Sequence, residues 1–532
     1  MTLPSAHPLT PSPTRRAIDR LPAHLRRYVV DQDHGAYTPR DHAVWRHILH
    51  RLTDRLKHTA HASYLCGLAA TGIGLEAIPS LDEMNGKLEA LGWSAVGVRG
   101  FIPPAVFTEL QSLGVLAIAA DIRSHEHIEY TPAPDIVHES AGHAPILADR
   151  RYADYLKRCG EAGFRAIASV EDQAVYEAIR HLSVVKEDPS ATEEETQLAE
   201  ARLRAAAASR RYESESTKAS RLYWWTAEYG LVGDLDDPKL YGAGLLSSLG
   251  EAVHCLTDTV KRVPLSLACV DAEYDITRMQ PQLFVARDFD HLFDVLEAFE
   301  ATLSWRRGGD HGLAEALRAR TVNHLQLADG LELTGRVTGQ IVARGPVAPG
   351  LSTALARIEG PVLLSRRGAA EGPPWAGEAL VAFGRGALPP RGAFSLELPS
   401  GLALSGFRVD GHEVIDLRGH LDGRPLDLPS WALLFLSEGL PSVAGGPADP
   451  GSWDRWFGDQ GAFSEGEAEA QARTRKAESL PAEVAELYLE VRALREGGRR
   501  DGPGLRALAD QVRRHPAEWL LQAELSELEA MA

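Results

Sequence analysis

The feature that most constrains this chain is a pair of histidines beside a carboxylate. His138 and His143 are five residues apart, and Glu139 directly follows the first of them. On a regular α-helix, positions i and i+5 lie roughly 140° apart around the axis, so both imidazoles can reach one metal ion only if the turn is distorted. Gly142 and Pro145 permit such a turn. The spacing therefore predicts a metal site on an irregular turn, and it differs from the zinc-protease pattern His-Glu-x-x-His, which would need a histidine in place of Gly142.

A third ligand is expected well downstream, and the best candidate is Glu228. Two neutral imidazoles and one carboxylate form the facial triad that suits Fe(II), and this triad leaves coordination positions open for oxygen or water. Trp224 lies four residues before Glu228, so a helix would place both on the same face. A tryptophan at helical spacing is more often a core residue than a functional one.

Five stretches of the chain resemble the pterin-dependent aromatic amino acid hydroxylases, and most closely the phenylalanine hydroxylases. The stretches occur in the family's order, which disfavours a chance cluster of structural histidines. They are residues 37–45, 130–145, 223–230, 241–248 and 283–302.

The resemblance implies an Fe(II)- and tetrahydropterin-dependent monooxygenase that uses O₂ to hydroxylate the ring of an aromatic amino acid. The metal ligands it implies are His138, His143 and Glu228. The favoured reaction is L-phenylalanine to L-tyrosine, and tryptophan hydroxylation by the same mechanism is the alternative. Two readings from other classes are a metal-dependent hydrolase and a catalytically inactive homologue that acts as a binding module. A hydrolase would more naturally use zinc and a water-activating base.

The resemblance also assigns residues to the pterin cofactor. Phe107 matches the aromatic residue that stacks on the pterin ring, and Ile102 and Tyr223 match further cofactor contacts. Glu139 matches a glutamate at the reaction centre that contacts the pterin rather than the metal, although its position also allows a general base. An aromatic residue such as Phe107 would otherwise be read as part of a core.

The amino acid substrate is assigned in the same way. Arg123 matches the arginine that binds the substrate carboxylate, and its planar fork suits this task because a guanidinium can make two parallel hydrogen bonds. Asp135 matches the acid that orients this arginine. Residues near the head of the amino acid or around its ring are Thr131, Ser247, Trp224 and Ile276, and Trp224 is also placed at the reaction centre. An apolar residue at Ile276 makes tyrosine the least favoured substrate.

The chain is expected to contain a mainly α catalytic domain with a few short strands, followed by a small β-rich domain and a helical tail. The predicted boundaries are a disordered leader at 1–27, the catalytic domain at 28–322, the β-rich domain at 323–430, a linker at 431–466 and the helical tail at 467–532. The leader is rich in Pro and Arg. The β-rich domain is predicted from short alternating segments between Gly and Pro residues. The tail is expected to serve self-association or packing.

His143 and Glu228 are 85 positions apart, which predicts a helical insertion at about 170–218. A helix from about residue 190 to 211 within it should begin with a capping box, formed either by Ser190 and Glu193 or by Thr192 and Glu195. Elsewhere, residues 38–41 carry a helix-start signature and residues 113–119 are short and apolar enough for a strand.

Composition excludes several classes of partner. With 56 basic and 74 acidic residues the net charge is −18, which argues against nucleic acid and anionic membranes. No run of about 20 apolar residues and no apolar leader is present, so a soluble, cytoplasmic protein is expected. The four cysteines have no C-x-x-C spacing, and neither a zinc ribbon nor a disulfide framework is predicted. The oligomeric state does not follow from the sequence.

Overall fold

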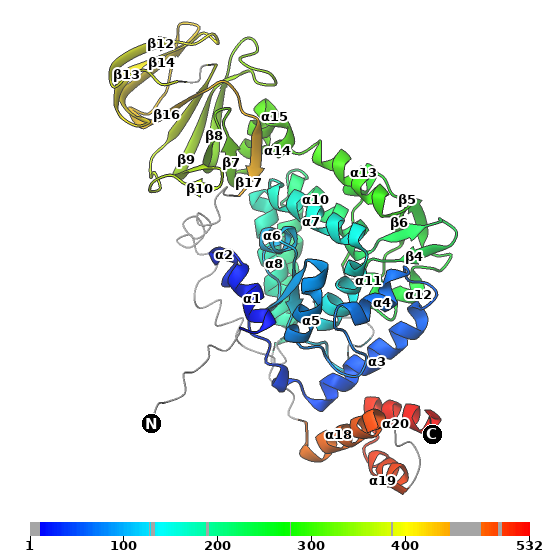
Figure 1. The fold of residues 1–532 in the computed structure, drawn as a ribbon. Coiled ribbons are helices and arrows are strands. Elements are labelled where there is room, and N and C mark those ends of the chain that lie inside the picture. The colour runs from blue at the N-terminus through cyan, green and yellow to red at the C-terminus, as the bar shows by residue number, and fades with distance from the viewer. Residues whose placement is uncertain are drawn as a thin grey trace, which may run out of the picture.

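The computed structural model describes residues 11–126, 128, 134–187, 191–276, 278–384, 387–446, 480–497 and 503–531. These residues form a β-sheet domain, a large helical domain and a small bundle of C-terminal helices, with the helical domain in the middle (Figure 1). The predicted metal ligands lie in the helical domain. Within the described part of the chain, no helix combines the length and the apolar character needed to cross a membrane.

The helical domain is mainly α with a few short strands, as the sequence predicts. Its helices are α1 (Pro13–Arg20), α2 (Ala23–Arg26), α3 (Pro39–Leu56), α4 (Ser63–Ala70), α5 (Leu81–Leu88), α6 (Pro104–Ser112), α7 (Arg150–Arg165), α8 (Val170–Glu187), α9 (Glu193–Ala208), α10 (Glu215–Tyr223), α11 (Ala243–Leu246), α12 (Glu251–His254) and α13 (Phe289–Glu300). Strands β1 (Ser94–Val98) and β2 (Val115–Ala119) pair in parallel, and β2 covers most of the strand predicted at 113–119. A second sheet has the order β4-β3-β6-β5, built from β3 (Leu231–Gly233), β4 (Pro238–Leu240), β5 (Lys261–Pro264) and β6 (Gln282–Ala286).

Helix α3 begins where its sequence signature predicts. Thr38 caps the helix and forms a capping box with Asp41, which satisfies two backbone N–H groups of the first turn. The buried face includes Trp45, Ile48 and Leu49, none of which is more than marginally exposed. Burying an apolar side chain of this size stabilises the fold by about 1.5–3 kcal/mol, so this face fixes α3 in the core.

The prediction of a disordered leader is wrong for residues 13–26. Helices α1 and α2 bury Ala17, Leu21 and Leu25 in a small apolar cluster with residues of β1, β2 and α6. His24 also pairs with Glu109 of α6 at 2.8 Å, with both side chains buried. The Pro- and Arg-rich composition hid an amphipathic helix whose apolar partners lie about 70 to 100 residues further along the chain.

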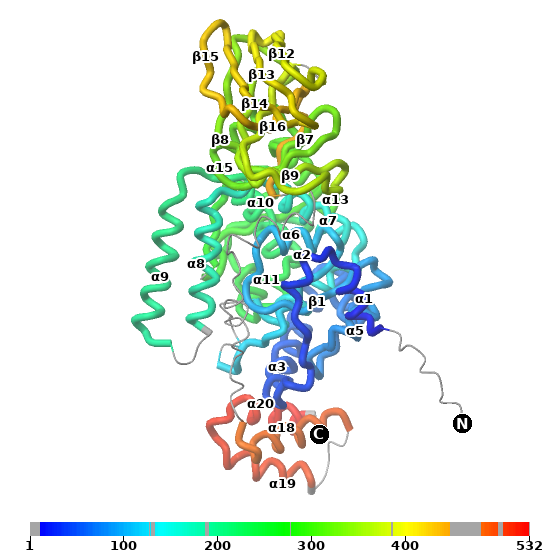
Figure 2. Tube along the Cα trace, turned by 90° about the vertical axis from the view of Figure 1, so that its left-hand side faces the viewer, coloured from blue at the N-terminus to red at the C-terminus, as the bar shows by residue number. Residues whose placement is uncertain are grey.

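The predicted helical insertion corresponds to α8 and α9, which run side by side along one flank of the helical domain (Figure 2). The capping box at the start of α9 is formed by Thr192 and Glu195, one of the two predicted pairs. Leu198 of α9 is 71% exposed, whereas Val175 and Ala178 of α8 are buried. Helix α8 is therefore the member of the pair that packs on the domain.

The β-sheet domain contains one sheet of 11 strands. The order along its main path is β12-β13-β14-β16-β11-β9-β8-β7-β17, with β10 beside β9 and β15 beside β14; only the β11–β16 pair is parallel. The strands are β7 (Val322–Gln326), β8 (Leu331–Val342), β9 (Thr353–Arg366), β10 (Ala369–Ala370), β11 (Ala379–Phe383), β12 (Gly392–Glu397), β13 (Leu402–Asp410), β14 (Glu413–Leu421), β15 (Arg424–Leu426), β16 (Trp431–Ser437) and β17 (Ser442–Gly445). Separate apolar clusters cover its two faces.

Two predicted boundaries of this domain are wrong. The segment predicted as a linker from residue 431 instead supplies β16, which lies between β14 and β11, and β17 at the edge. On the other side, α15 (Gly309–Ala319) packs Leu313 and Ala316 into the core of the sheet, so the domain begins before residue 323. The short helix α14 (Ser304–Arg307) lies beside β17. The remainder of the predicted linker, from residue 447, is outside the described residues.

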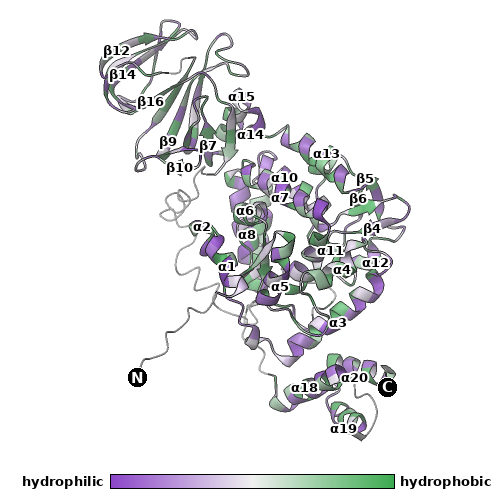
Figure 3. Ribbon diagram, in the orientation of Figure 1, coloured by the Kyte–Doolittle hydropathy of each residue, from purple (hydrophilic) through white to green (hydrophobic). Residues whose placement is uncertain are grey.

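The C-terminal bundle consists of α18 (Ala482–Gly497), α19 (Pro503–Val512) and α20 (Trp519–Met531). Both hydrophobic and hydrophilic residues appear along α18 and α20, as expected for helices that bury one face (Figure 3). Their buried residues, including Tyr488 and Leu521, join the same apolar cluster as α3. These helices therefore pack on the helical domain of the same chain. Residues 467–479 of the predicted tail lie outside the described residues.

Candidate metal centre and surrounding pocket

The two ligand-bearing turns are both π-helical. Val137–His143 forms one such turn, η3, and Trp224–Glu228 forms the other, η5, which continues directly from α10. A π-helix has i→i+5 hydrogen bonds, so residues five apart lie nearly above one another instead of on diverging faces. The distortion that the spacing of His138 and His143 predicts is therefore present.

Gly142 is the residue that lets η3 approach its neighbour. A Cβ atom at this position would lie 2.7 Å from the carbonyl oxygen of Ala243 in α11 and 3.1 Å from the Ala243 Cβ. A larger residue would push the turn and α11 apart. Because η3 carries both histidines, this close contact fixes their distance from the rest of the site.

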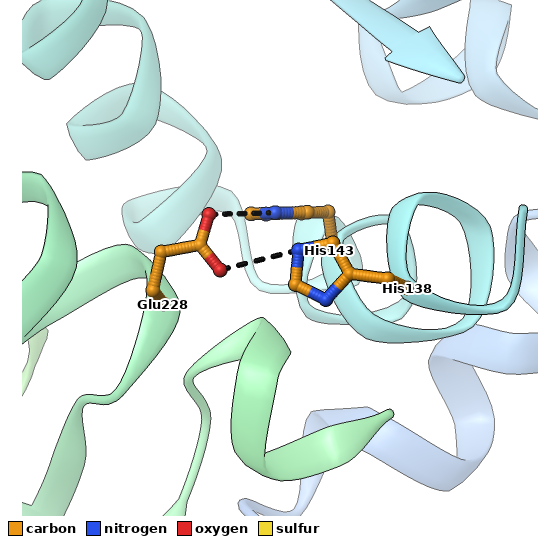
Figure 4. Close-up of side chains that lie close together, drawn as sticks. All are labelled: His138, His143 and Glu228. Atoms are coloured by element: carbon orange, nitrogen blue, oxygen red, sulfur yellow. Dashed lines mark ion pairs between the residues drawn. The ribbon is translucent and has the colours of Figure 1, made fainter. Parts of the chain in front are cut away.

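His138, His143 and Glu228 come together as the sequence predicts. Nε2 of His138 lies 3.2 Å from Oε2 of Glu228, and Nε2 of His143 lies 3.2 Å from Oε1 of the same carboxylate. The ligand atoms all lie within 4.8 Å of one another, and the two imidazole planes are at 89°. Figure 4 shows one carboxylate oxygen directed at each ring. Among the described residues, these three side chains are the cluster of potential ligands that could hold a metal ion.

A hydrogen-bond relay fixes the tautomer of His138. Ser247 Oγ donates to the carbonyl oxygen of Ala243 at 2.7 Å, and it lies 3.0 Å from Nδ1 of His138. Because the hydroxyl proton is already donated, Nδ1–H of His138 must donate to Ser247. The lone pair of Nε2 then faces the site, as a metal ligand requires.

The environment of His143 fits a bound metal. Both of its ring nitrogens are buried and neither makes a hydrogen bond. Nε2 has the ion-pair contact of 3.2 Å with Glu228, and because a buried polar atom that makes no hydrogen bond is costly, a metal ion at Nε2 would satisfy it. Burial would by itself raise the pKa of Glu228, but His143 and His138 outweigh this effect and hold its pKa well below the usual range. The site thus offers two imidazole rings and an ionised carboxylate, the donor set of a facial triad.

Glu139 does not join this group of ligands. It is buried, and burial raises its pKa to about 8; His143 opposes this shift, whereas Glu228 and Asp135 add to it. A carboxyl group with this pKa is largely protonated at neutral pH and can donate a hydrogen bond. That property separates Glu139 from Glu228.

Arg123 and Asp135 form a buried, two-bonded pair. Nε and Nη2 of Arg123 donate to the two oxygens of Asp135, each at 2.8 Å. Burial alone would raise the pKa of Asp135, but the Arg123 guanidinium brings it below its ordinary value. Asp135 also accepts the backbone N–H of His138 at 3.0 Å, so the pair is attached to the first metal ligand.

Trp224 lies in a group of aromatic rings beside Glu228. It stacks on Tyr274 at 4.3 Å and 11°, and it lies 4.6 Å from the ring of Tyr229. Neither tyrosine was singled out from the sequence, although Tyr229 lies in the stretch 223–230, which carries the resemblance. Ile276 lies two residues after Tyr274 and is 39% exposed, and Thr131 lies outside the described residues.

Among the residues assigned to the pterin, Tyr223 lies near His143 and Phe107 lies beside Tyr223. The ring of Tyr223 is 6.3 Å from that of His143 and 5.6 Å from that of Phe107, which it meets edge-on. Ile102 packs in the same apolar cluster as Phe107. Gln111 of α6, which the sequence gave no reason to select, donates through Nε2 to the Tyr223 hydroxyl at 2.6 Å.

Fold and site together define a helical domain with a His-His-Glu group that could hold a metal ion. Residues 28–183 and 167–307 match the sequence profile of the biopterin-dependent aromatic amino acid hydroxylases. The two matches cover more than half of the chain, so it belongs to this family. They overlap at 167–183, which includes most of α8.

Curated relatives within the family are phenylalanine-4-hydroxylases. That of Mesorhizobium japonicum is 29% identical over 286 residues, which cover 53% of this chain and 87% of the relative. That of Pseudomonas aeruginosa is 30% identical over 263 residues, which cover 49% and 83%. Among solved structures, phenylalanine hydroxylase from Chromobacterium violaceum with bound iron(III) and 7,8-dihydrobiopterin is 26% identical, with a TM-score of 0.42 and coverage of 55% of this chain and 92% of that chain.

Proposed function

We propose that this chain hydroxylates L-phenylalanine to L-tyrosine with Fe(II), a tetrahydropterin and O₂. The observation that carries the proposal is the buried group of His138, His143 and Glu228 on two π-helical turns, in a chain of the biopterin-dependent hydroxylase family. Its relatives are named phenylalanine-4-hydroxylases, and a Chromobacterium violaceum relative has been solved with iron and phenylalanine bound.

Fe(II) and tetrahydropterin, when bound, supply the activation of O₂ and the transfer of one oxygen atom to the ring. His138, His143 and Glu228 would hold the iron on one side and leave its other positions open. Ser247 keeps the His138 lone pair directed at the iron. Because His143 is buried, the residues around it exclude water from this side of the site.

On the substrate side, Arg123 is the residue proposed to bind the carboxylate of the amino acid. Its guanidinium is oriented by Asp135, and Nη1 reaches only a long contact of 3.5 Å to the carbonyl oxygen of Ser247. Donors on this nitrogen therefore remain for an incoming carboxylate. Thr131 and Ser247 are proposed near the amino acid head.

The ring of the substrate is proposed to lie against Trp224 and Ile276. The indole at Trp224 leaves less room than a smaller aromatic residue would, so a one-ring substrate is favoured. Discrimination by apolar shape is worth about 1–3 kcal/mol per methylene-sized difference, so we expect slow hydroxylation of tryptophan rather than its exclusion.

Pterin binding is proposed on the side of Phe107, Ile102 and Tyr223. Phe107 would stack on the pterin ring, and Glu139 would contact the pterin. This arrangement assigns different tasks to the two glutamates of the site, with Glu228 on the metal and Glu139 on the cofactor.

The test is an amino acid panel with Fe(II) and tetrahydropterin, followed by product identification and metal analysis. Tyrosine formed from phenylalanine, with pterin-dependent O₂ consumption, is the expected result. Faster formation of 5-hydroxytryptophan would leave the reaction class standing and overturn the substrate. Zinc-dependent activity without pterin would indicate a hydrolase, and iron and pterin binding without turnover would indicate an inactive homologue.

Two matched variants test the assignment of the glutamates. Glu228→Gln should lose most of the iron, because the anionic ligand is gone, whereas Glu139→Gln should retain iron and weaken pterin use. Iron content measured by atomic absorption separates the two. Equal metal loss in both variants would show that the carboxylates are wrongly assigned.

A further inference from the structure

The inserted helix α8 is anchored at its start to the helix that leads to Glu228. Asp172 of α8 accepts hydrogen bonds from Ser214 Oγ at 2.6 Å and from Thr217 Oγ1 at 2.9 Å. Ser214 is the N-cap of α10, which runs directly into the π-turn of Glu228. Asp172 also accepts the N–H and the hydroxyl of Ser169, both at 2.8 Å. The base of α8 is therefore tied to the metal-binding side of the site.

One turn further along α8, Tyr176 reaches the segment between β1 and α6. Its hydroxyl donates to the carbonyl oxygen of Phe101 at 2.9 Å. The side chain is half-buried, and burial raises the pKa of Tyr176, so the phenol stays protonated and remains a donor. Val175 and Ala178 on either side of it are buried, which holds this part of α8 against the domain.

Phe101 belongs to the loop 99–103 that joins β1 to α6. This loop has no regular secondary structure, and Gly100 has a φ of +58°, in the left-handed region that favours glycine. Among the described residues, no other hydrogen bond reaches the backbone of residues 99–102. The loop contains Ile102 and leads directly into α6, which carries Phe107.

We propose that α8 braces this loop, and that Tyr176 is a positioning residue for the pterin cofactor. The inference rests on the proposed function, which assigns Ile102 and Phe107 to the pterin. In this arrangement the insertion links the helix of the metal ligand Glu228 to the loop of the cofactor, through Asp172 at one end and Tyr176 at the other. Without the bond from Tyr176, the loop would sample conformations in which Ile102 does not face the pterin.

The test is the variant Tyr176→Phe, which removes the hydroxyl and keeps the ring. We expect hydrogen–deuterium exchange of backbone amides in residues 97–107 to become faster. Loss of one hydrogen bond of this kind predicts that the Kd for 7,8-dihydrobiopterin, measured by calorimetry on the iron-loaded protein, rises roughly three- to tenfold. The KM for phenylalanine and the iron content should stay unchanged, because Tyr176 hydrogen-bonds neither to the residues proposed to bind phenylalanine nor to the proposed iron ligands.

The matched control is Tyr212→Phe, between α9 and α10. The Tyr212 hydroxyl makes no hydrogen bond, and its ring lies under the guanidinium of Arg318. The same change of phenol to phenyl at this position should therefore alter neither exchange in residues 97–107 nor pterin affinity.

The outcomes are distinguishable. Unchanged exchange and unchanged pterin affinity in Tyr176→Phe, in a wild type that hydroxylates phenylalanine, would overturn the brace and leave the proposed function standing. Iron loss, or an equal weakening of pterin and amino acid, would show a general structural role for Tyr176 and overturn the inference as well. If the wild type binds no pterin, the proposed function fails, and the assignment of Tyr176 to a cofactor fails with it.

Discussion

A buried ion pair between α3 and α20 is expected to hold the C-terminal bundle on the helical domain. Nε of Arg46 donates to Oε1 of Glu524 at 2.6 Å, and Nη2 donates to Oε2 at 3.0 Å. The side chains are 1% and 2% exposed, so neither charge is screened by solvent. Arg46 also donates to the carbonyl oxygen of Glu76 at 3.0 Å.

Glu524→Gln would leave the Arg46 charge buried without its counter-ion. Breaking a buried pair in this way costs about 3–5 kcal/mol, whereas removing an exposed charge costs about 0–1 kcal/mol. The matched control is Glu529→Gln on the same helix, because Glu529 pairs with Arg513 at 3.2 Å and both side chains are well exposed. The double variant Arg46→Met with Glu524→Leu removes both charges and should recover most or all of the lost stability.

The assay is native-state hydrogen–deuterium exchange of α18 to α20, which reports the free energy of local opening without assuming that the whole chain unfolds in one step. Glu524→Gln should lower the opening free energy of α20 by about 3–5 kcal/mol, and Glu529→Gln by less than about 1 kcal/mol. Equal effects of the two variants would refute the reasoning. So would a double variant no more stable than Glu524→Gln alone.

Three further predictions concern individual groups. Burial raises the pKa of Glu251 from 4.5 to about 7, although a hydrogen bond from the N–H of Gln280 opposes this shift. The folded state therefore favours the protonated carboxyl, and the stability that this preference contributes is complete below pH 4.5 and is lost as the pH rises through about 7. Glu251→Gln should therefore raise stability at pH 8 by about 3 kcal/mol and leave it nearly unchanged at pH 4.5, and thermal unfolding with the wild-type pH slope would contradict this. Arg123→Lys cannot reproduce the two parallel bonds to Asp135 and should raise the KM of every amino acid substrate by roughly tenfold or more, with an unchanged phenylalanine-to-tryptophan ratio. Trp224→Phe should shift the kcat/KM ratio toward tryptophan by roughly tenfold or more; an unchanged ratio would mean that the indole does not limit the ring pocket.

The irregular turn that carries His138 and His143 was predictable because its constraints are local. Five-residue spacing between His138 and His143 is incompatible with one ion on a 3.6-residue helix, so some distortion had to exist. The form of the distortion could not be read from the sequence, because residue propensities do not distinguish a π-turn from other irregular turns. Capping boxes such as Thr192 with Glu195 were predictable for the same reason, since donor and acceptor are three residues apart.

Elements that depend on distant partners were missed. Residues 431–437 form a nearly continuous apolar run without the alternation expected of a strand with one wet face. In the structure β16 is buried on both faces, because Phe435 lies in one apolar cluster and Leu434 in the other. A strand that is buried on both faces has a continuous apolar sequence, and periodicity alone cannot distinguish it from a buried helical segment. Its parallel pairing with β11, about 50 residues earlier, could not be inferred locally.

Asp135 shows why the substrate and metal sides of the pocket should respond together. One carboxylate orients Arg123 through two hydrogen bonds and also accepts the backbone N–H of His138, at the start of the ligand turn η3. Ser247 repeats this connection, because its hydroxyl faces His138 Nδ1 while its carbonyl oxygen faces Arg123 Nη1. A shift of Arg123 toward a bound carboxylate would therefore change the position of His138 through two separate contacts, one with Asp135 and one with Ser247. Asp135 and Ser247 thus each contact both Arg123 and His138, so such coupling would need no movement of a domain.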